Sequence, residues 1–484
     1  MRADLPILLA AALGALLGWP RLPNAAGSDA PATGFSADRA MGRIRVWSPE
    51  PRPTGSEAHE AVVDSLDHDL TSLGFDVQRQ TPGALTNLVA SSPGAGPEGV
   101  WLVAHSDSVA AAPGAADDGL GLGVVLEAAR ALSVERPPGR LHVLITDGEE
   151  RGLRGATAFV HDAPAADRLA INIDARGTEG PAYMFQMAGS TPELLSAWRA
   201  SGCAAQATSL AQTVYDLLPN DTDFTVFRGA GWRGYNFALI GGAWRYHTAD
   251  DTIANLAPRS VQQIGDCVLG LARAWLDRAP GLPAAPSERA YAQVAGLTIG
   301  APPWLVTLLG LAPLGLLRWR TAPRSCATFA AVALLTVLAG ALISRGAQVF
   351  WPGFSTAIAE VPNPGPLYAA VLLLGLAGCA FLRRFSPDGM AAPTILLTAA
   401  VAGLAPAVGY ILVPGAWVAG LRGRRTWWPA VVPALLAGLL LGPFYAAICP
   451  ALTTRMLPVL AVVPLVTLGG LFSRSAEKGT SAGS

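Results

Sequence analysis

Two hydrophobic runs, residues 100–104 and 141–145, each end in polar residues whose types suit metal chemistry. These polar residues are His105, Asp107, Asp147, Glu149 and Glu150. We predict that both runs are buried strands of an open α/β sheet, where ligands bind at the carboxyl ends of the strands. Histidine and carboxylate groups at two neighbouring strand ends can hold a metal ion and leave one carboxylate free as a general base. This combination indicates metal-assisted hydrolysis.

His105, taken alone, has two interpretations: a structural histidine with satisfied hydrogen bonds, or a metal ligand. Asp107 lies two residues further on, so in an extended chain its side chain points to the same side. Its carboxylate can orient the imidazole of His105 by a hydrogen bond, as the partners of metal-bound histidines do. The pair therefore favours the metal interpretation.

Asp117 and Asp118 follow this strand after a loop rich in Gly and Ala. Either carboxylate can cap the helix that the apolar spacing predicts over residues 122–132. Asp118 is the better cap if the helix begins at Gly119, which leaves Asp117 free to bind a metal.

Glu149 and Glu150 are either a solvated pair or part of the metal site. Two glutamates directly after a buried strand are costly unless a cation neutralises them. We therefore predict that one of them binds metal while the other accepts a proton from a bound water.

Two further ligand candidates follow later strands. Asp174 comes after the hydrophobic run 169–173, and His247 lies in an apolar neighbourhood beside Tyr246. The candidates together are two histidines, two aspartates and one glutamate, with one glutamate to spare. Two Zn²⁺ ions need about this many ligands, with one carboxylate bridging them and a water or hydroxide shared between them.

The order of these residues resembles that of the co-catalytic zinc peptidases of family M28. The motifs that carry the resemblance, over roughly residues 40–277, are Gly55-Ser56-Glu57, His105-x-Asp107, Gly114-Ala-Ala-Asp117-Asp118, Asp147-x-Glu149-Glu150, Asn172-Ile-Asp174 and Tyr246-His247-Thr-x-x-Asp251-Thr. The spacing from Asp117 to Glu127 also matches the family and selects Asp117 over Asp118 as the bridging ligand. Gly119-Leu120 departs from the family, where Ala-Ser is commoner, but changes a helix start and not a ligand.

The resemblance implies a role for each residue. Five residues would be ligands of two zinc ions, His105, Asp117 and Asp174 for one, and His247, Asp117 and Glu150 for the other. Glu149 would be the general base and acid, Asp107 would orient His105, and Tyr246 would help to stabilise the tetrahedral oxyanion. The implied activity is that of an aminopeptidase, an exopeptidase in which a metal-bridged hydroxide attacks the N-terminal bonds of peptide substrates.

Strands alternate with helices over residues 37–278, which predicts a three-layer α/β sandwich with a mostly parallel central sheet. The expected strands are 75–79, 86–90, 100–104, 141–145, 169–173 and 235–240. The expected helices are 37–47, 59–73, 122–132, 156–161, 192–201 and 258–277. Residues 21–36 and 279–300 are rich in Pro and Ala and are predicted to be linkers.

Residues 301–473 are predicted to form a multi-span α-helical membrane domain, followed by a cytoplasmic tail at 474–484. Only 14% of the 484 residues are charged, against roughly 25% in a typical soluble protein. The apolar spans are 304–317, 327–343, 367–382, 394–413, 430–447 and 457–472, and several approach the ~20 residues needed to cross a bilayer. A peptidase-like domain followed by such spans, with Asn220-Asp-Thr-Asp223-Phe, is similar to the membrane-bound M28 branch that includes endoplasmic reticulum metallopeptidase 1 and vacuolar membrane protease.

Arginine clusters at 318–324, 383–384 and 422–425 place those loops and both termini in the cytoplasm, with the peptidase-like domain on the opposite side. The stretch 394–421 then needs an even number of crossings. We expect a hairpin broken at Pro406 or Pro414, or a re-entrant element, and seven or eight crossings in all. Because the spans lack carboxylates, an anchor is favoured over a transport role.

Two features keep alternatives open. Residues 5–19 are apolar and read as a cleaved signal peptide or as a retained signal-anchor helix over 1–20, and the lack of an Ala-x-Ala-like site directly after the run favours the anchor. Cys203 and Cys267 are either two buried thiols, the favoured interpretation, or a disulfide if this part of the chain is exported.

Rival functions follow from the same residues. A non-catalytic membrane scaffold or receptor would be expected to lack ligands, and a glutaminyl cyclase-like aminoacyltransferase with one zinc fits the Glu149-Glu150 pair less well. A carboxypeptidase would need a cation for the substrate carboxylate, such as Arg176, Arg233 or Arg245. The net charge of -1 and the lack of a basic patch argue against nucleic acid as a partner. The expected partners are a peptide substrate and the lipid bilayer.

Overall fold

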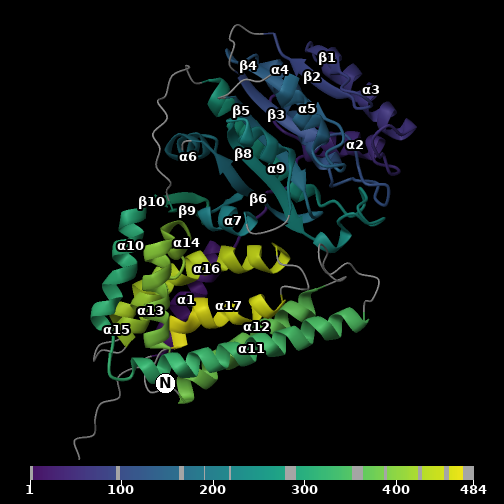
Figure 1. The fold of residues 1–484 in the computed structure, drawn as a ribbon. Helices are drawn as coiled ribbons and strands as arrows, with labels where there is room; N and C mark the ends of the chain where they lie inside the picture. Colours follow the sequence, from purple (N-terminus) through teal and green to yellow (C-terminus); the bar gives the residue numbers. More distant parts are fainter. Residues whose placement is uncertain are drawn as a thin grey trace, which may run out of the picture. The chain divides into compact units, whose positions relative to one another are not determined.

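The computed structural model describes residues 4–93, 99–162, 168–189, 191–216, 220–277, 290–350, 364–385, 390–422, 428–451 and 457–472 (Figure 1). The chain forms two compact units. The sheet unit is residues 21–288, and the helical unit combines residues 1–20 with residues 289–484. The sheet unit is therefore inserted, in sequence, between two parts of the helical unit.

A mixed sheet of eight strands forms the centre of the sheet unit, in the order β1-β2-β4-β3-β5-β8-β6-β7. The strands are β1 Asp76–Gln80, β2 Asn87–Ser91, β3 Gly99–His105, β4 Arg140–Thr146, β5 Leu169–Ala175, β6 Glu179–Ala188, β7 Gln206–Ala207 and β8 Arg233–Gly241. The four central strands β4, β3, β5 and β8 are parallel. β2 joins β4, and β6 joins β8, in antiparallel pairs. The predicted α/β class is confirmed, with antiparallel strands added towards both edges.

Helices cover both faces of this sheet. They are α2 Ala37–Trp47, α3 Glu57–Ser72, α4 Gly119–Glu135, α5 Arg154–Asp162, α6 Thr191–Ala200, α7 Ser209–Tyr215, α8 Asp223–Gly229 and α9 Pro258–Leu276. On one face Trp101 and Val103 of β3 share a core cluster with Phe159 of α5 and Phe224 of α8. Side chains alternate along a strand, so Leu102 points to the other face, where α4 and α9 contact β3 and each other. Burial on both faces explains why β3 and β4 are unbroken hydrophobic runs.

β6, β7, α7 and α8 were not among the predicted elements. β6 contains Gly180 and Pro181 near its start, residues that disfavour a strand assignment. α7 and α8 have seven residues each, too few for a helical period to stand out in the sequence.

The segment 21–36, predicted to be a linker, packs along the sheet unit. The guanidinium group of Arg39 donates to the carbonyl oxygens of Ser28, Ala30 and Gly34 at 2.9, 3.0 and 2.8 Å. Phe35 is buried. Composition predicted a linker here, whereas hydrogen bonds from the Arg39 side chain to backbone carbonyl groups hold the segment in place.

Cys203 and Cys267 form a disulfide, with their Cα atoms 4.4 Å apart. The favoured expectation of two free thiols was therefore wrong. The two residues are 64 positions apart in the sequence, and only the packing of α9 beside the segment after α6 brings them together.

The helical unit consists mainly of apolar helices. They are α1 Asp4–Gly18, α10 Pro303–Leu311, α11 Ala322–Phe350, α12 Gly365–Phe385, α13 Ala391–Leu404, α14 Pro406–Gly409, α15 Val413–Arg422, α16 Val431–Ala451 and α17 Leu457–Leu468. Among the described residues, three helical stretches are long and apolar enough to span a membrane: Ala322–Ala347, Gly365–Phe385 and Trp428–Cys449. Shorter apolar helices accompany them, which agrees with the predicted membrane domain. The predicted tail at 474–484 lies outside the described residues.

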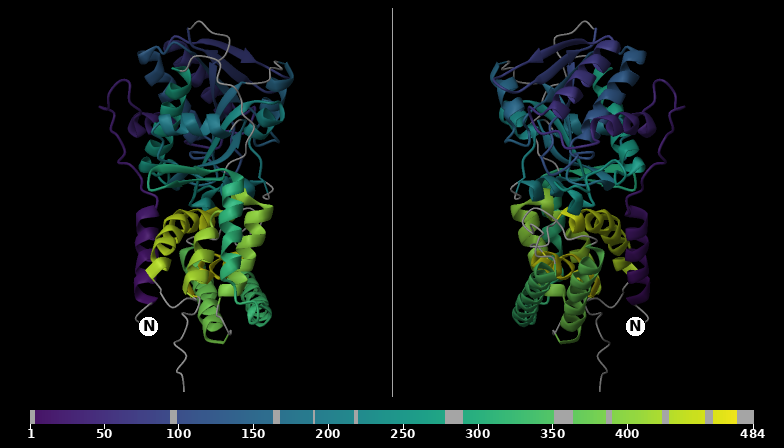
Figure 2. Two further views of the ribbon diagram at one scale, coloured as in Figure 1. Left: turned by 90° about the vertical axis from the view of Figure 1, so that its left-hand side faces the viewer. Right: turned by 90° about the vertical axis from the view of Figure 1, so that its right-hand side faces the viewer.

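α1, the purple helix in Figure 2, packs directly against α16. Small residues lie at this contact. A Cβ atom on Gly438 would lie 2.0 Å from the carbonyl oxygen of Ala11, and one on Gly442 would lie 2.6 Å from that of Ala15. Only glycine permits such an approach, as in other closely packed membrane helices. From the Ala11–Gly438 contact to the Ala15–Gly442 contact the residue numbers of both helices increase, so the two helices run parallel.

The stretch 394–421 forms a helical hairpin broken at Pro406. α13 ends just before this proline, and Pro414 lies within α15, which excludes it as the break. Separate clusters join the arms at the two ends, Ala402 with Val413 and Ala392 with Ala419. The arms are therefore antiparallel.

Part of the predicted linker 279–300 is ordered as a β-hairpin. β9 Ala290–Val294 pairs antiparallel with β10 Leu297–Ala301, and every residue of β9 is buried. The hairpin belongs to the helical unit. Residues 279–289 of this predicted linker lie outside the described part of the chain.

His142 of β4 is buried against the ring of Trp101, with ring centroids 4.3 Å apart, and its Nδ1 lies 2.8 Å from the Ser91 hydroxyl oxygen. Burial, together with the charges of Arg140 and Arg168, lowers the pKa of His142 to about 4. An unfolded histidine has a pKa of about 6.5. Between these values the unfolded chain binds a proton that the folded chain does not, so stability falls as the pH falls from about 6.5 to about 4.

We therefore expect the melting temperature of the sheet unit to fall more between pH 7.5 and pH 5 in the wild type than in His142→Phe. The difference should be roughly 4 °C. Phenylalanine keeps the stack on Trp101 but cannot bind a proton. Differential scanning fluorimetry on the detergent-solubilised chain measures the melting temperature of each protein at both pH values. An equal fall in the wild type and in His142→Phe would contradict the lowered pKa of His142.

Candidate metal centre

The predicted site residues meet at the carboxyl ends of the parallel strands. His105 is the last residue of β3 and pairs in register with Thr146 at the end of β4. Asp174 is the next-to-last residue of β5, and His247 follows β8 after the short helix η1 (Ala243–Arg245). Ligands of open α/β sheets bind at this edge, as the sequence predicted.

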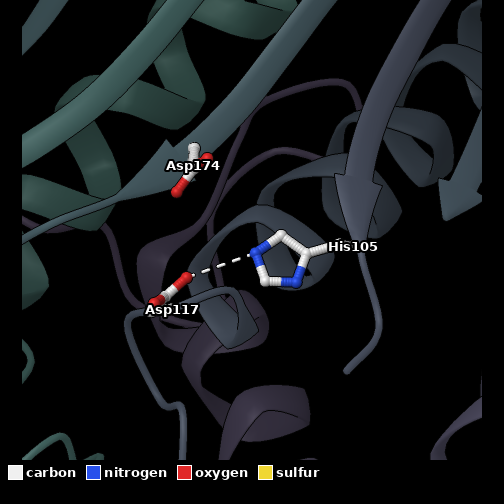
Figure 3. A group of neighbouring side chains, drawn as sticks. All are labelled: His105, Asp117 and Asp174. Carbon is white, nitrogen blue, oxygen red and sulfur yellow. Dashed lines mark hydrogen bonds and ion pairs between the residues drawn. The ribbon is translucent and has the colours of Figure 1, made fainter. Parts of the chain in front are cut away.

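Asp117 lies between two histidines. His105 Nε2 is 3.2 Å from Asp117 Oδ1, and His247 Nε2 is 3.0 Å from Asp117 Oδ2. Figure 3 shows the first contact, with Asp174 at a neighbouring strand end. Each oxygen of one carboxylate thus faces a different histidine, which is the geometry that a bridging ligand requires.

Two groups of three ligand atoms result, each with its atoms within 4.8 Å of one another. The groups are His105, Asp117 and Asp174, and Asp117, Glu150 and His247. Glu150 Oε2 is 3.1 Å from His247 Nε2, while Glu150 Oε1 is buried and has no hydrogen-bond partner among the described residues. Leaving a buried carboxylate oxygen unpaired is costly, and imidazole nitrogens with carboxylate oxygens are ligands that Zn²⁺ accepts. The residues fit a pair of zinc ions that share Asp117.

Without metal, the ionisable groups of this site are strongly perturbed. Burial and the charge of Asp117 raise the pKa of Asp174 to about 7. Burial also raises the pKa of Glu150. Although burial alone would lower it, hydrogen bonds to Asp117 and Glu150 raise the pKa of His247 to about 10. Carboxylates that repel one another and histidines that hold protons between them are typical of a functional site.

Asp107 makes more contacts than the sequence predicted. Its carbonyl oxygen lies 3.0 Å from His105 Nδ1, closer than its carboxylate oxygen Oδ1 at 3.4 Å. The carboxylate instead accepts hydrogen bonds from the backbone N–H groups of Glu149 and Glu150, at 3.1 and 3.3 Å. It also accepts one from the Thr54 hydroxyl at 3.2 Å. Asp107 therefore positions both glutamates as well as His105.

Asp118 and Asp251 hold the loop that carries Asp117. Asp118 caps α4 by accepting from the Gly121 N–H at 2.9 Å, the role that left Asp117 free. The carboxylate of Asp251 accepts from the N–H groups of Ala116 and Asp117, at 2.7 and 3.1 Å. Sequence reasoning found Asp251 only as part of a motif, because nothing local to it indicates contact with a loop more than 130 residues earlier.

The two residues predicted to act in catalysis lie beside the ligands. Glu149 directly precedes Glu150, and burial together with the carboxylates of Asp174 and Asp223 raises its pKa. The ring of Tyr246 stacks on that of His247, with centroids 3.7 Å apart. A carboxylic acid with a raised pKa is suited to exchanging protons near neutral pH.

Residues 87–272 match the family model for Peptidase family M28. This stretch is therefore similar to an M28 peptidase, and we call the sheet unit that contains it the M28 domain. The match covers every predicted ligand and Glu149, and lies within the sheet unit.

Curated relatives are similar to almost half of this chain. The mouse protein named endoplasmic reticulum metallopeptidase 1 is 31% identical over 255 residues, covering 46% of this chain and 28% of the relative. The Candida albicans protein named vacuolar membrane protease is 28% identical over 228 residues, covering 44% of this chain and 27% of the relative. The resemblance to this membrane-bound branch is confirmed over about half of the chain. The chain spans less than a third of the length of these relatives.

Solved structures are also similar to about half of this chain. A Zn-dependent exopeptidase from Parabacteroides distasonis is 19% identical with a TM-score of 0.42, covering 50% of this chain and 99% of that one. A glutaminyl cyclase from Porphyromonas gingivalis is 22% identical with a TM-score of 0.40, covering 49% and 98%.

We expect Asp107→Asn to lower kcat for peptide hydrolysis by about 10–100-fold while zinc content stays near that of the wild type. The amide has only one acceptor oxygen, so one of the two backbone N–H groups loses its partner. The contact between His105 and the backbone carbonyl of residue 107 is kept. Peptidase kinetics and metal analysis on the same preparation test this.

Thr54→Val is the matched control, because it removes one hydrogen bond to Asp107 and leaves both glutamate contacts intact. Its kcat should stay within a few-fold of the wild type. An Asp107→Asn variant with wild-type kcat would show that the carboxylate does not position Glu149.

Proposed function

We propose that the M28 domain is a zinc-dependent aminopeptidase that binds two Zn²⁺ ions per chain. The observation that carries this proposal is the position of Asp117, whose two carboxylate oxygens each face a different histidine. His105 and Asp174 would complete one site, and Glu150 and His247 the other. Relatives named as a metallopeptidase and a protease support peptide substrates.

Each residue of the site then has a defined task. When bound, the zinc ions would lower the pKa of a water molecule and polarise the scissile carbonyl group. Glu149 would accept the proton of the attacking water and pass it to the departing amine, a role that its raised pKa suits. Asp107 would hold Glu149 through its backbone N–H. Tyr246, stacked on His247, would donate a hydrogen bond to the tetrahedral oxyanion.

The arginines near the site give little support to a carboxypeptidase, which needs a cation for the substrate carboxylate. Arg233 is the first residue of β8, five positions before Ala238, which pairs in register with Asp174. This separates Arg233 from the site by roughly 16 Å along the strand. Arg245 donates to the Thr178 hydroxyl at 2.9 Å and lies 3.7 Å from Glu179. Arg176 is the remaining candidate, and the blocked peptide described below tests it.

The other rival functions make less use of the geometry. A scaffold or receptor would have no need for two complete ligand groups around one carboxylate. A glutaminyl cyclase-like transferase with one zinc would leave two of the five ligand residues without a metal. The full set therefore favours the hydrolytic function.

We also propose that the M28 domain lies outside the cytoplasm, anchored by eight membrane crossings. Leu317, directly after the short helix η2 (Ala312–Leu316) that follows α10, and Ala419 near the end of α15 share a cluster with Ala322 at the start of α11. α1 runs parallel to α16, which follows Arg422. The arginine-bearing ends thus gather at one end of the bundle, which the positive-inside rule places in the cytoplasm. The disulfide between Cys203 and Cys267 suits an oxidising compartment.

Protease protection tests this orientation. In spheroplasts of a bacterial expression host, proteinase K should digest the M28 domain and leave a C-terminal epitope tag intact. Digestion of both in detergent is the control for access. A protected domain with a cleaved tag would reverse the orientation.

The proposed activity is tested on detergent-purified full-length chain. We expect about two zinc per wild-type chain and hydrolysis of peptides with a free N-terminus but not of their N-acetylated forms. Glu149→Gln should keep its zinc and lose about 10²–10⁴-fold in kcat, because it can no longer accept a proton. Asp117→Ala should lose zinc from both sites.

Glu135→Gln is the matched control, since Glu135 pairs with Arg273 at the far end of α4 and touches no ligand. It should keep wild-type kcat. Cleavage of only the N-acetylated peptide would contradict the aminopeptidase proposal and favour a different exopeptidase. One zinc per folded chain would favour the cyclase, and none would favour the scaffold.

A further inference from the structure

Arg52 is the one arginine that is buried among the described residues of the sheet unit. It belongs to the loop between α2 and α3, binds no metal, and has no exposed surface. A buried guanidinium group is costly unless its N–H donors are satisfied and its charge is compensated. The groups that accept its hydrogen bonds therefore indicate which parts of the chain Arg52 positions.

The guanidinium group binds the two chain segments that carry His105 and Asp117. Its Nε donates to the carbonyl oxygen of Ser106, between His105 and Asp107, at 2.8 Å. Its Nη1 and Nη2 donate to the carbonyl oxygens of Pro113 and Gly114, at 2.6 and 2.9 Å. One planar group thus spans the end of β3 and the loop that leads to Asp117.

Two further features fit this connection. Ser108 and Arg52 are also joined through the backbone, because Arg52 N–H donates to the Ser108 hydroxyl at 3.0 Å and Ser108 N–H donates to the Arg52 carbonyl at 3.1 Å. Gly114 has a φ of +67°, and a Cβ atom there would lie 2.4 Å from the Asp117 carbonyl oxygen and 3.1 Å from Arg52 Nη1. Only glycine lets the loop pass this close to the arginine.

The charge of Arg52 acts on the same segments. Asp107, Asp117, Asp118 and Asp251 all interact electrostatically with it, and all four are buried. Without a cation these carboxylates repel one another, which tends to separate the loops that carry them. Arg52 opposes this separation by its charge and by the hydrogen bonds to both loops.

We propose that Arg52 is a positioning residue that sets zinc affinity by holding the His105 and Asp117 loops at ligand spacing before metal binds. The inference rests on the proposed zinc site, but it concerns the metal-free protein. Lysine at this position would keep the charge and lose the fork of donors that spans the two loops. A change in an outer partner of metal ligands typically lowers metal affinity by about 10–100-fold.

The experiment measures zinc dissociation constants by chelator competition, and melting temperatures with and without zinc, for full-length wild type, Arg52→Lys and Arg39→Lys. Arg39 is the matched control, because its guanidinium group also donates to several carbonyl oxygens, those of the segment 28–34. Its ion pair is with Glu127 of α4, which is not a ligand candidate. Arg52→Lys should raise the zinc dissociation constant by about 10–100-fold and reduce the melting-temperature gain on zinc binding. Arg39→Lys should lower both melting temperatures equally and leave zinc affinity unchanged.

Wild-type zinc affinity in folded Arg52→Lys would overturn the inference while leaving the zinc site intact. A wild type that binds no zinc would instead overturn the proposed function. If Arg52→Lys does not fold, Ser48→Ala provides the test. It removes one acceptor of Arg52 Nη1, at 3.0 Å, and should raise the zinc dissociation constant several-fold, whereas an unchanged constant would count against the role.

Discussion

Buried negative charge at the carboxyl edge of the central sheet is the constraint on which the M28 domain depends. Asp107, Asp117 and Asp118 are buried. The carboxyl groups of Asp174, Glu149 and Glu150 are close enough to Asp117 to interact with its charge. Charges so close together in a poorly solvated site are unstable unless cations or hydrogen bonds compensate them. The two histidines and Arg52 balance part of this negative charge. Metal ions bound by the two ligand groups would balance the rest. The local fold therefore holds acidic groups together against their mutual repulsion.

The outer contacts of the site show how this is achieved. Asp107 holds the two glutamates by their backbone N–H groups, and Asp251 holds the Asp117 loop in the same way. Arg52 donates hydrogen bonds to backbone carbonyl groups of the His105 and Asp117 loops. In each case a charged side chain binds backbone groups, whose positions vary less than those of flexible side chains. Because the loops are held by the backbone, the ligands can keep their spacing without contacts between every pair of side chains. Arranged groups of this kind reduce the reorganisation that binding and catalysis would otherwise require.

The helical unit is subject to a different physical constraint. Apolar helices buried in lipid can associate only through close packing and hydrogen bonds, since the hydrocarbon offers no hydrophobic gain. The contacts of α1 with α16 at Gly438 and Gly442 meet this demand by bringing backbones together. They also make α1 part of the folded helical unit. The inserted position of the M28 domain then ties both of its ends to the same membrane unit.

The sequence by itself determined the central strands and the chemistry of the site, because both leave local patterns. Buried parallel strands are unbroken apolar runs, so the ends of β3, β4 and β5 were predicted to within two residues, with His105, Glu150 and Asp174 at or close after them. The family resemblance then distinguished Asp117 from Asp118, which composition alone left open. Local pattern did not reveal β6, α7 or α8, whose runs are short or interrupted by Gly and Pro.

Only the tertiary structure decided which distant groups meet. Arg52, Asp251 and the disulfide between Cys203 and Cys267 act on partners more than 50 residues away, and no spacing in the chain encodes such contacts. The same holds for the parallel packing of α1 on α16 and for the break of the hairpin at Pro406 rather than Pro414. Local sequence specifies which residues can form an element or bind a metal. The long-range packing that opposes chain entropy specifies where those elements meet.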